Sequence, residues 1–437
     1  MAVPVTNSAS TGSASIVRGN ALPLLILVVA VFFLLGGVTN INDVLIPKLK
    51  GLFSLSNFEA NLVQFAFFTS YALFSIPAGL LVAKLGYMRS FTVGFLVVAT
   101  GALMFIPAAS SGLFVSFLAA LFVVGGGITL LQVGMNPVVI ALGAPETAHS
   151  RLTFAQFFNS LGVFLMIYGG AELLLGKGSG VDPATLSGEA LNQYRVTESA
   201  VIGQAYFWVA AFLAAIALIF WIRRRALDAA KAEQLQLAGT WSLFLNNSRV
   251  RFGALCIFMY VGAEVAIGSN LINYLSGDAH VAGDGVMGID ALAAGKMLAY
   301  YWGGAMVGRA VGGVVLRLIL PGRVLSGYAM LAIALIAVSA FTTGALSGWM
   351  LVLVGFFNSL MFPTIFSLAT EGLTDEAPKA SGIICTAIVG GAIVPPLFGW
   401  VTDVATIQAA LIVPVICYAI IAAFGWYARR PAGEAIG

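Results

Sequence analysis

The chain has 437 residues, of which 60% are hydrophobic and only 9% charged, and its mean hydropathy is +0.99. Soluble proteins contain roughly 25% charged residues, so this composition excludes a soluble protein and predicts an integral membrane protein. The net charge of +3 rests on few residues and predicts no nucleic-acid partner. Cys256, Cys385 and Cys417 lie in separate apolar runs without metal or redox spacing, so no metal site is expected.

Apolar stretches recur along the whole chain, and each is long enough to cross a hydrocarbon core of roughly 30 Å. They lie between a polar tail at 1–21, which we expect to be disordered and cytoplasmic, and a short tail at 429–437. The twelve predicted spans are 22–47, 58–83, 90–109, 113–142, 153–175, 203–223, 253–276, 291–319, 325–344, 347–371, 381–404 and 408–428. Because the runs are continuous and not alternating, they predict helices and not the strands of a membrane barrel.

The distribution of Lys and Arg orients these spans. With the N-terminus inside, 15 basic residues fall on the cytoplasmic side and 5 in the outer loops, while Arg309 falls inside a span. Basic residues concentrate in cytoplasmic loops, so both termini are expected inside. The long cytoplasmic linker at 224–252 then separates a six-helix half at 22–223 from a second at 253–428. The outer loop at 176–202 is expected to be solvated and irregular.

The two halves repeat each other's pattern at similar intervals along the chain. Gly79, Lys84 and Arg89 follow the second span, and Gly312 and Arg317 follow the eighth. Further matching pairs are Pro137 with Pro363, Gly162 with Gly391 and Gly170 with Gly399. Parallel repeats of six spans describe the major facilitator architecture, in which pseudo-two-fold related halves hold the substrate near the membrane midplane. We interpret the glycine and basic residues after spans two and eight as a gating motif.

Polar side chains inside the spans are few, and an ionisable residue there is a functional candidate by default. The candidate carboxyl groups for proton or cation coupling are Asp43 in the first span and Glu264 in the seventh. The candidate substrate contacts are Asn40, Gln132, Asn136, Gln156, Asn159, Asn270, Asn273, Trp302 and Asn358. Amides and carboxylates suit vicinal hydroxyls, and aromatic faces suit the C–H face of a pyranose, so a sugar fits better than a phosphate ester or a cationic drug.

These residues also have structural explanations. Asn and Gln commonly hydrogen-bond one membrane helix to another. Asp43 lies about 22 residues into its run, which at 1.5 Å per residue places it near the outer interface, where it would only be the wet end of a helix. Glu264 has the alternative of a structural ion pair with Arg309.

Five motifs carry a family resemblance. They are "NINDVLIPKL", "NFEANLVQFAFFTSYALFSIPAGLLVAKLGY", "GMNPVVIALG", "RLTFAQFFNSLG" and "FPTIFSLA". Together they resemble the fucose/glucose/galactose permease family of sugar:cation symporters, within the major facilitator superfamily, over residues 25–428. The resemblance implies sugar uptake coupled to a cation, usually the proton, in the inner membrane of a bacterium.

The resemblance also implies roles for single residues. Asp43 matches the proton-responsive carboxylate, and Asn159 matches a sugar ligand, with Gln156 one turn before it. The fucose branch has a glutamate in a stretch like "LETAANP", where this chain reads "LLQVGMNP" and has Gln132. Glu264, in turn, stands where that branch has a glutamine, so we interpret the second acid as moved from span four to span seven. These variants are more similar to the glucose, galactose or N-acetylglucosamine members.

The sequence therefore predicts a secondary active transporter and not an enzyme, since its spans contain no nucleophile–base pair. We expect a monomer in the bilayer, without cofactor, that imports a hexose or hexose derivative by proton symport and alternating access. Burial favours the neutral form of a carboxyl group, so protonation of Asp43 would let it move through the interior. Two alternatives remain: an oxygen-rich Na⁺ site at Asp43 in a sugar symporter, and a drug or metabolite exporter of the same fold.

Overall fold

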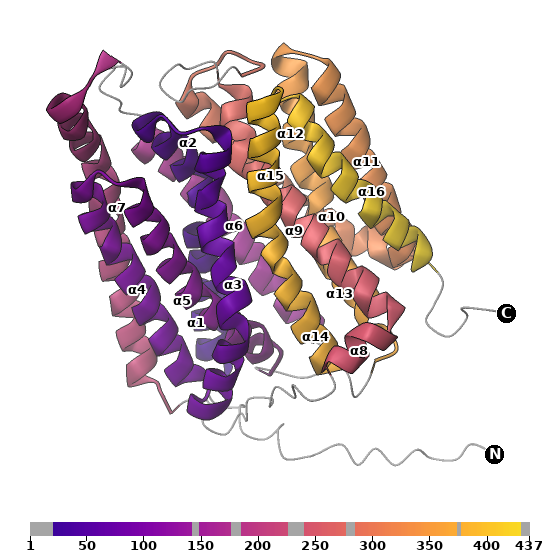
Figure 1. Ribbon diagram of the computed structural model, residues 1–437. Helices are drawn as coiled ribbons and strands as arrows, with labels where there is room; N and C mark the ends of the chain where they lie inside the picture. Colours follow the sequence, from indigo (N-terminus) through magenta and orange to yellow (C-terminus); the bar gives the residue numbers. More distant parts are fainter. Residues whose placement is uncertain are drawn as a thin grey trace, which may run out of the picture.

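The computed structural model of the chain describes residues 21–141, 148–175, 185–225, 240–276, 285–373 and 377–429. These residues form an all-helical bundle, and the β pairing among them is an isolated bridge between Ser276 and Ile289. The predicted N-terminal tail, except for its last residue, and nearly all of the predicted C-terminal tail lie outside the described residues. The bundle consists of two groups of long helices that stand side by side (Figure 1).

The first group follows the predicted first half. It contains α1 (Ala21–Asn40), α2 (Asn42–Phe53), α3 (Asn57–Leu85), α4 (Tyr87–Ser111), α5 (Phe114–Ala141), α6 (Ala148–Leu175) and α7 (Gly188–Ile222). The short helix α8 (Thr240–Asn246) falls in the predicted linker. We call the end of the bundle where α2 finishes the α2 end (top in Figure 1) and the opposite one the α8 end.

The second group follows the predicted second half. It contains α9 (Ser248–Leu275), α10 (Ala291–Leu318), α11 (Pro321–Phe341), α12 (Gly344–Asn358), α13 (Met361–Thr370), α14 (Ala377–Thr386), α15 (Gly390–Val404) and α16 (Ile412–Tyr427). Short 3₁₀ turns at Ala387–Val389 and Ala409–Leu411 precede α15 and α16.

Eleven helical segments of the described residues are long and apolar enough to cross a membrane. Three of them join consecutive helices, because α1 continues into α2, α12 into α13 and α14 into α15. The helix α10 occupies the predicted eighth span and has 28 residues, but it is not among the eleven. It contains Tyr300, Tyr301, Trp302 and Arg309, whose polar atoms lower the hydropathy of the helix. The all-helical, multi-pass architecture is thus confirmed, while the count of twelve spans and the inside location of both termini stay predictions.

The first and tenth predicted spans are each divided by a break in the helix. Ile41 separates α1 from α2, and beside it the Asn40 amide donates to the Gly36 carbonyl at 3.0 Å. A polar side chain that bonds to the preceding turn competes with the helix backbone. The break between α12 and α13 falls at Ser359, four residues before Pro363, whose ring clashes with the carbonyl at that spacing. The first break places Asp43 in the first turn of α2 instead of mid-helix.

The prediction of an irregular outer loop through residue 202 is wrong in its second part, because α7 begins at Gly188. The extra turns of α7 lie against α2. Lys48 in α2 forms an ion pair with Glu198 at 2.8 Å, and the guanidinium of Arg195 lies 5.2 Å from the ring centroid of Phe53. These contacts stabilise helical turns in a segment that is too polar to be recognised as part of a span.

Each half is held together by a close contact between a glycine and a backbone carbonyl. A Cβ atom on Gly162 in α6 would lie 1.8 Å from the carbonyl oxygen of Phe33 in α1. A Cβ atom on Gly390 at the start of α15 would lie 1.9 Å from the carbonyl oxygen of Phe258 in α9. Small residues let membrane helices approach this closely. The fifth span thus packs on the first as the eleventh packs on the seventh, which agrees with the predicted internal repeat.

The two groups meet mainly along three pairs of helices. The helix α3 packs against α15, α6 packs against α10, and α2 packs against α9. In Figure 1, α3 and α15 run side by side through the middle of the bundle. We call this contact region the seam, and the candidate site lies on it.

Candidate functional site

The carboxyl group of Asp43 lies buried in the seam, with 2% of the residue exposed. Its Oδ1 accepts hydrogen bonds from Ser269 Oγ and Gln64 Nε2, both at 2.9 Å. Its Oδ2 accepts one from the indole Nε1 of Trp302 at 3.1 Å. A buried charge must be paired or hydrogen-bonded to be tolerated, and three donors face this one. The interpretation of Asp43 as a solvent-exposed residue at the end of a helix is therefore wrong.

The donors to Asp43 come from both halves of the molecule. Gln64 belongs to α3 of the first half, whereas Ser269 belongs to α9 and Trp302 to α10 of the second. Gln64 Nε2 also donates to Ser269 Oγ at 2.7 Å, which leaves the serine hydroxyl to donate to the carboxylate. The first turn of α2 adds the positive end of a helix dipole beside Asp43. One carboxyl group thus links the two halves of the molecule.

A second polar contact across the seam lies nearer the α2 end. The amide groups of Asn61 in α3 and Asn270 in α9 bond each other reciprocally, at 3.0 and 3.1 Å. Both residues are buried, and the amide of Asn270 also donates to the Ala266 carbonyl at 2.8 Å. Breaking this pair leaves two amides to be satisfied by water or by a ligand, since buried polar groups are otherwise costly.

A third contact closes the seam at the α2 end itself. Asp403, in the last turn of α15, accepts hydrogen bonds from the backbone N–H groups of Asn57 and Phe58, each at 2.8 Å. The Asn57 side chain donates to the same carboxylate at 2.8 Å. These backbone groups begin α3 and have no partner within their own helix. The two halves are therefore joined by hydrogen bonds at the α2 end.

Glu264 lies in a separate polar network inside the second half. Tyr260 donates its hydroxyl hydrogen to Glu264 Oε1 at 2.7 Å. The Asn358 amide donates to the Tyr301 hydroxyl at 2.8 Å, and Tyr418 donates to Asn358 Oδ1 at 2.7 Å. The Tyr301 hydroxyl in turn donates to the Glu264 backbone carbonyl at 3.2 Å. Glu264 is only partly buried, whereas Asn358 is fully buried.

Arg309 joins α10 to α6 and not to Glu264. Its guanidinium donates to the backbone carbonyl of Gln156 at 3.3 Å and to the hydroxyl of Ser160. Among the described residues no ion pair links Arg309 to Glu264, so the alternative of a structural ion pair between them is wrong. The hydrogen bonds of Arg309 instead cross the seam, because α6 and α10 belong to different halves.

The predicted amides of the first half fall into two groups. Asn40 bonds to its own helix, and the Asn159 amide donates to the Phe32 carbonyl of α1 at 2.9 Å. The Asn159 bond helps α1 and α6 pack, whereas the Asn40 bond lies within α1. The side chains of Gln132 in α5 and Gln156 in α6 are partly buried. Asn136 also lies in α5, but its side chain is outside the described part of the structure.

Asn273 differs from the other predicted amides. It is 1% exposed, and neither its amide nitrogen nor its amide oxygen has a hydrogen-bond partner among the described residues. It lies one turn beyond Ser269 on α9, on the face that carries the donor to Asp43. A buried amide without partners costs free energy unless another group occupies it in some state of the protein.

The predicted gating residues lie where helices end. Gly79 is buried in α3, and Lys84 is exposed near the end of that helix. Arg89 is exposed in the first turn of α4, across the turn at Gly86, which has a φ of 81°. Gly312 is buried in α10, and a Cβ atom there would meet the Leu360 side chain at 2.2 Å. The side chain of Arg317 is outside the described residues.

Sequence reasoning missed several residues of the seam. Gln64 and Asn61 stand in the apolar second span, and their position among apolar neighbours was the available signal. Ser269 directly precedes Asn270, but a serine in a membrane helix usually bonds to its own backbone and gives no such signal. Asp403 stands at a predicted helix end, where an acidic residue is ordinary.

The comparisons with known proteins agree with this architecture. A profile of the Major Facilitator Superfamily matches residues 27–388. The chain belongs to the Major Facilitator Superfamily. A glucose/galactose transporter of Brucella abortus biovar 1 (strain 9-941) is 43% identical over 394 residues, which cover 90% of this chain and 91% of the relative. The superfamily thus accounts for the two helix groups and their seam.

Two further comparisons place the chain within the superfamily. The L-fucose–proton symporter of Escherichia coli (strain K12) is 33% identical over 418 residues, covering 93% of each chain. A crystal structure of a variant of the E. coli fucose:proton symporter matches with a TM-score of 0.70 and 30% identity, over 94% of this chain and 100% of the other. These relatives are sugar transporters and not enzymes, as the sequence motifs predict.

Proposed function

We propose that the protein imports a hexose or hexose derivative, of the glucose, galactose, mannose or N-acetylglucosamine type, together with a proton. The observation that carries the proposal is the buried carboxyl group of Asp43, which receives donors from both halves. The names of the relatives, glucose/galactose transporter and L-fucose–proton symporter, support both the sugar and the proton. The protein would act as a monomer in a bacterial inner membrane, without cofactor.

In this proposal the α2 end faces the outside of the cell and both termini face the cytoplasm, as the distribution of basic residues predicts. The bonds of Asp403, Asn61 and Asp43 across the seam then describe a conformation that is closed to the outside. Rocking of the halves would break these bonds and open the path from outside. The candidate gating residues Gly79, Lys84, Arg89, Gly312 and Arg317 would limit the same movement from the opposite side.

Proton coupling follows from the two environments of Asp43. When the outer side opens, Ser269 and Trp302 move away with the second half, and water can reach the carboxylate and protonate it. Closing the path returns the group to the interior, and a neutral carboxyl group is cheaper to bury than a charged one. The three donors bond more strongly to a carboxylate than to a neutral carboxyl group. Release of the proton to the inside regenerates the carboxylate and thereby restores the three strong hydrogen bonds.

The donors around Asp43 favour a proton over Na⁺. A sodium ion requires oxygen ligands with free lone pairs, whereas Oδ2 faces the indole N–H of Trp302, which can only donate. Oδ1 faces a serine hydroxyl and the amide of Gln64.

The sugar would lie between the halves, in contact with Trp302, Glu264 and the amides of α5 and α6. Glu264 Oε1 is held by Tyr260, while Oε2 accepts no hydrogen bond from a described residue and can accept one from a sugar hydroxyl. Trp302 can stack on the sugar ring and hold Asp43 through its N–H at the same time. The remaining proposed contacts are Asn40, Gln132, Asn136, Gln156, Asn159, Asn270, Asn273 and Asn358.

The test is the substitution Asp43→Asn, which keeps the shape of the side chain and removes the titrating group. We expect proteoliposomes with this variant to exchange labelled sugar across the membrane but to lose accumulation driven by a pH gradient. Uptake in sodium-free buffer, with and without an uncoupler, identifies the ion in the unaltered protein. Uphill uptake that survives the substitution would overturn the role of Asp43, and uptake that requires sodium would overturn the choice of ion.

A further inference from the structure

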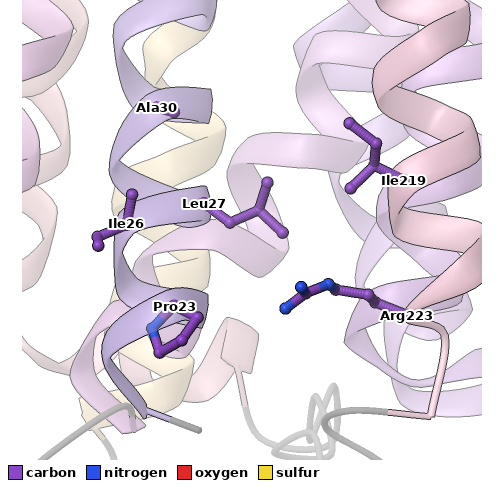
Figure 2. A pocket seen from close by; sticks show the side chains of 6 residues that line it. All are labelled: Pro23, Ile26, Leu27, Ala30, Ile219 and Arg223. Atoms are coloured by element: carbon purple, nitrogen blue, oxygen red, sulfur yellow. The ribbon is translucent and has the colours of Figure 1, made fainter.

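A groove of about 290 Å³ lies between α1 and α7 at the α8 end of the bundle, away from the seam (Figure 2). It is lined by five apolar residues and one cation: Pro23, Ile26, Leu27, Ala30, Ile219 and Arg223. Neither the proposed sugar site nor the gating residues reach it. The groove is apolar along its length and has a single positive charge at one end. Such a lining is complementary to an amphipathic ligand.

The walls of the groove belong to the lipid-facing surface. Ile26 is 61% exposed and Ile219 is 44% exposed, so both would contact the hydrocarbon of the membrane. Trp221, in the last turn of α7 and 49% exposed, has the amphipathic ring that marks the boundary between hydrocarbon and headgroups. The groove therefore opens toward the acyl chains, with Arg223 at the level of the headgroups.

Arg223 is available to a ligand, whereas its neighbour is not. Arg224 lies over the ring of Trp221 at 4.8 Å and donates to the Trp221 carbonyl at 3.1 Å. Arg223 makes no hydrogen bond or ion pair with a described residue, and its guanidinium extends across the groove toward α1 (Figure 2). A guanidinium that has no partner among the described residues and lies beside an apolar groove is complementary to a phosphate that carries an acyl chain.

We propose that this groove binds an anionic phospholipid of the cytoplasmic leaflet, with one acyl chain along Ile26, Leu27 and Ala30 and the phosphate at Arg223. Basic sites between membrane helices on the cytoplasmic side are suited to anionic headgroups. The proposal rests on the orientation proposed above, but it does not depend on the sugar or on the coupling ion. The bound lipid would join α1 and α7, the first and sixth spans of the first half.

The experiment measures lipid binding to the full-length protein by native mass spectrometry. The purified protein is titrated with phosphatidylglycerol or with phosphatidylethanolamine of the same acyl chains. The variant Arg223→Gln is compared with Arg429→Gln. Arg429 follows the C-terminal end of α16, as Arg223 follows the C-terminal end of α7, and its guanidinium lies 3.6 Å from the ring centroid of Trp426, so this control removes the same charge away from the groove. We expect Arg223→Gln to weaken phosphatidylglycerol binding about fivefold, as the loss of one basic residue near the headgroups implies, and Arg429→Gln to leave it unchanged.

A second variant tests the apolar part of the groove. Ala30 is exposed, so Ala30→Phe fills the channel without disturbing the core and should reduce phosphatidylglycerol binding to the level of the Arg223 variant. Equal binding of the two lipids by the unaltered protein, or equal losses in both arginine variants, would overturn the proposal. Full binding by the Ala30 variant would overturn it as well. Because the measurement needs no transport, its failure is distinct from a failure of the proposed function.

Discussion

Replacement of Asp403 by Asn should loosen the closure of the seam at the α2 end. The carboxylate accepts three hydrogen bonds of 2.8 Å from the start of α3, two of them from backbone N–H groups. An Asn side chain keeps one acceptor oxygen but turns an NH₂ group toward the remaining N–H donor. Asp403 also lies at the negative end of the α15 dipole, so its charge is favourable only while the positive end of α3 lies opposite.

The size of the effect follows from these bonds and from their exposure. Hydrogen bonds to a charged acceptor contribute about 1.5–3 kcal/mol each when they are shielded from water. Asp403 is exposed, and solvent screening reduces the sum to about 1–2 kcal/mol. The ratio of open to closed molecules should therefore rise about 5- to 30-fold.

Electron spin resonance between two spin labels measures this ratio. The labels are attached at Ser110→Cys and Thr343→Cys in a protein without the native cysteines. Both residues are exposed at the α2 end of the bundle, Ser110 near the end of α4 in the first half and Thr343 just before α12 in the second. The matched control is Glu59→Gln, which removes one charge from the start of α3. Among the residues that the structure describes, the Glu59 carboxylate bonds only to the backbone N–H of Ser56, in its own half. An unchanged distance distribution in the Asp403 variant, or an equal shift in the control, would refute the reasoning.

Two further substitutions test the seam and the packing of the first half. Trp302→Phe removes the hydrogen bond from the indole N–H to the buried carboxylate, which contributes about 1.5–3 kcal/mol, so gradient-driven accumulation in proteoliposomes should fall at least tenfold. The control Trp349→Phe alters an exposed indole and should leave accumulation unchanged. Gly162→Ala places a methyl group against the Phe33 carbonyl and should lower stability by about 1–3 kcal/mol, read as a lower unfolding temperature in detergent. Gly169→Ala, with nothing within 4 Å, serves as its control, and equal stability of the two variants would contradict the packing argument.

The sequence was sufficient to predict the helices because a membrane span needs only a long apolar run, which is visible without tertiary information. It was insufficient for segments whose helical state depends on neighbours. The start of α7 is polar, and its turns are held by Lys48 and by the ring of Phe53 from another helix. The break at Ile41 similarly depends on the local competition of the Asn40 amide with the backbone.

The candidate site was predictable in its charged member and not in its partners. A carboxyl group in an apolar run is conspicuous, so Asp43 could be selected from sequence alone. Its donors come from three other helices, and their proximity depends on how the halves are rotated and on the register of α3 against α9. Trp302 was selected as an aromatic platform for the sugar, but the structure shows that its N–H binds the acid. Nothing in the sequence marked Ser269 as the hydroxyl that faces it.

The contacts between α2 and α7 determine which half of the molecule carries Asp43. The ion pair of Lys48 with Glu198 fastens α2 to the first half, so Asp43 and Gln64 travel together, while Ser269 and Trp302 travel with the second half. Two of the three donors to Asp43 thus belong to the half of the chain that does not contain the acid. A chimera that exchanges the second half for that of a relative would keep Asp43 and Gln64 together but place the carboxyl group opposite different donors, so two of its three hydrogen bonds would depend on the exchanged half.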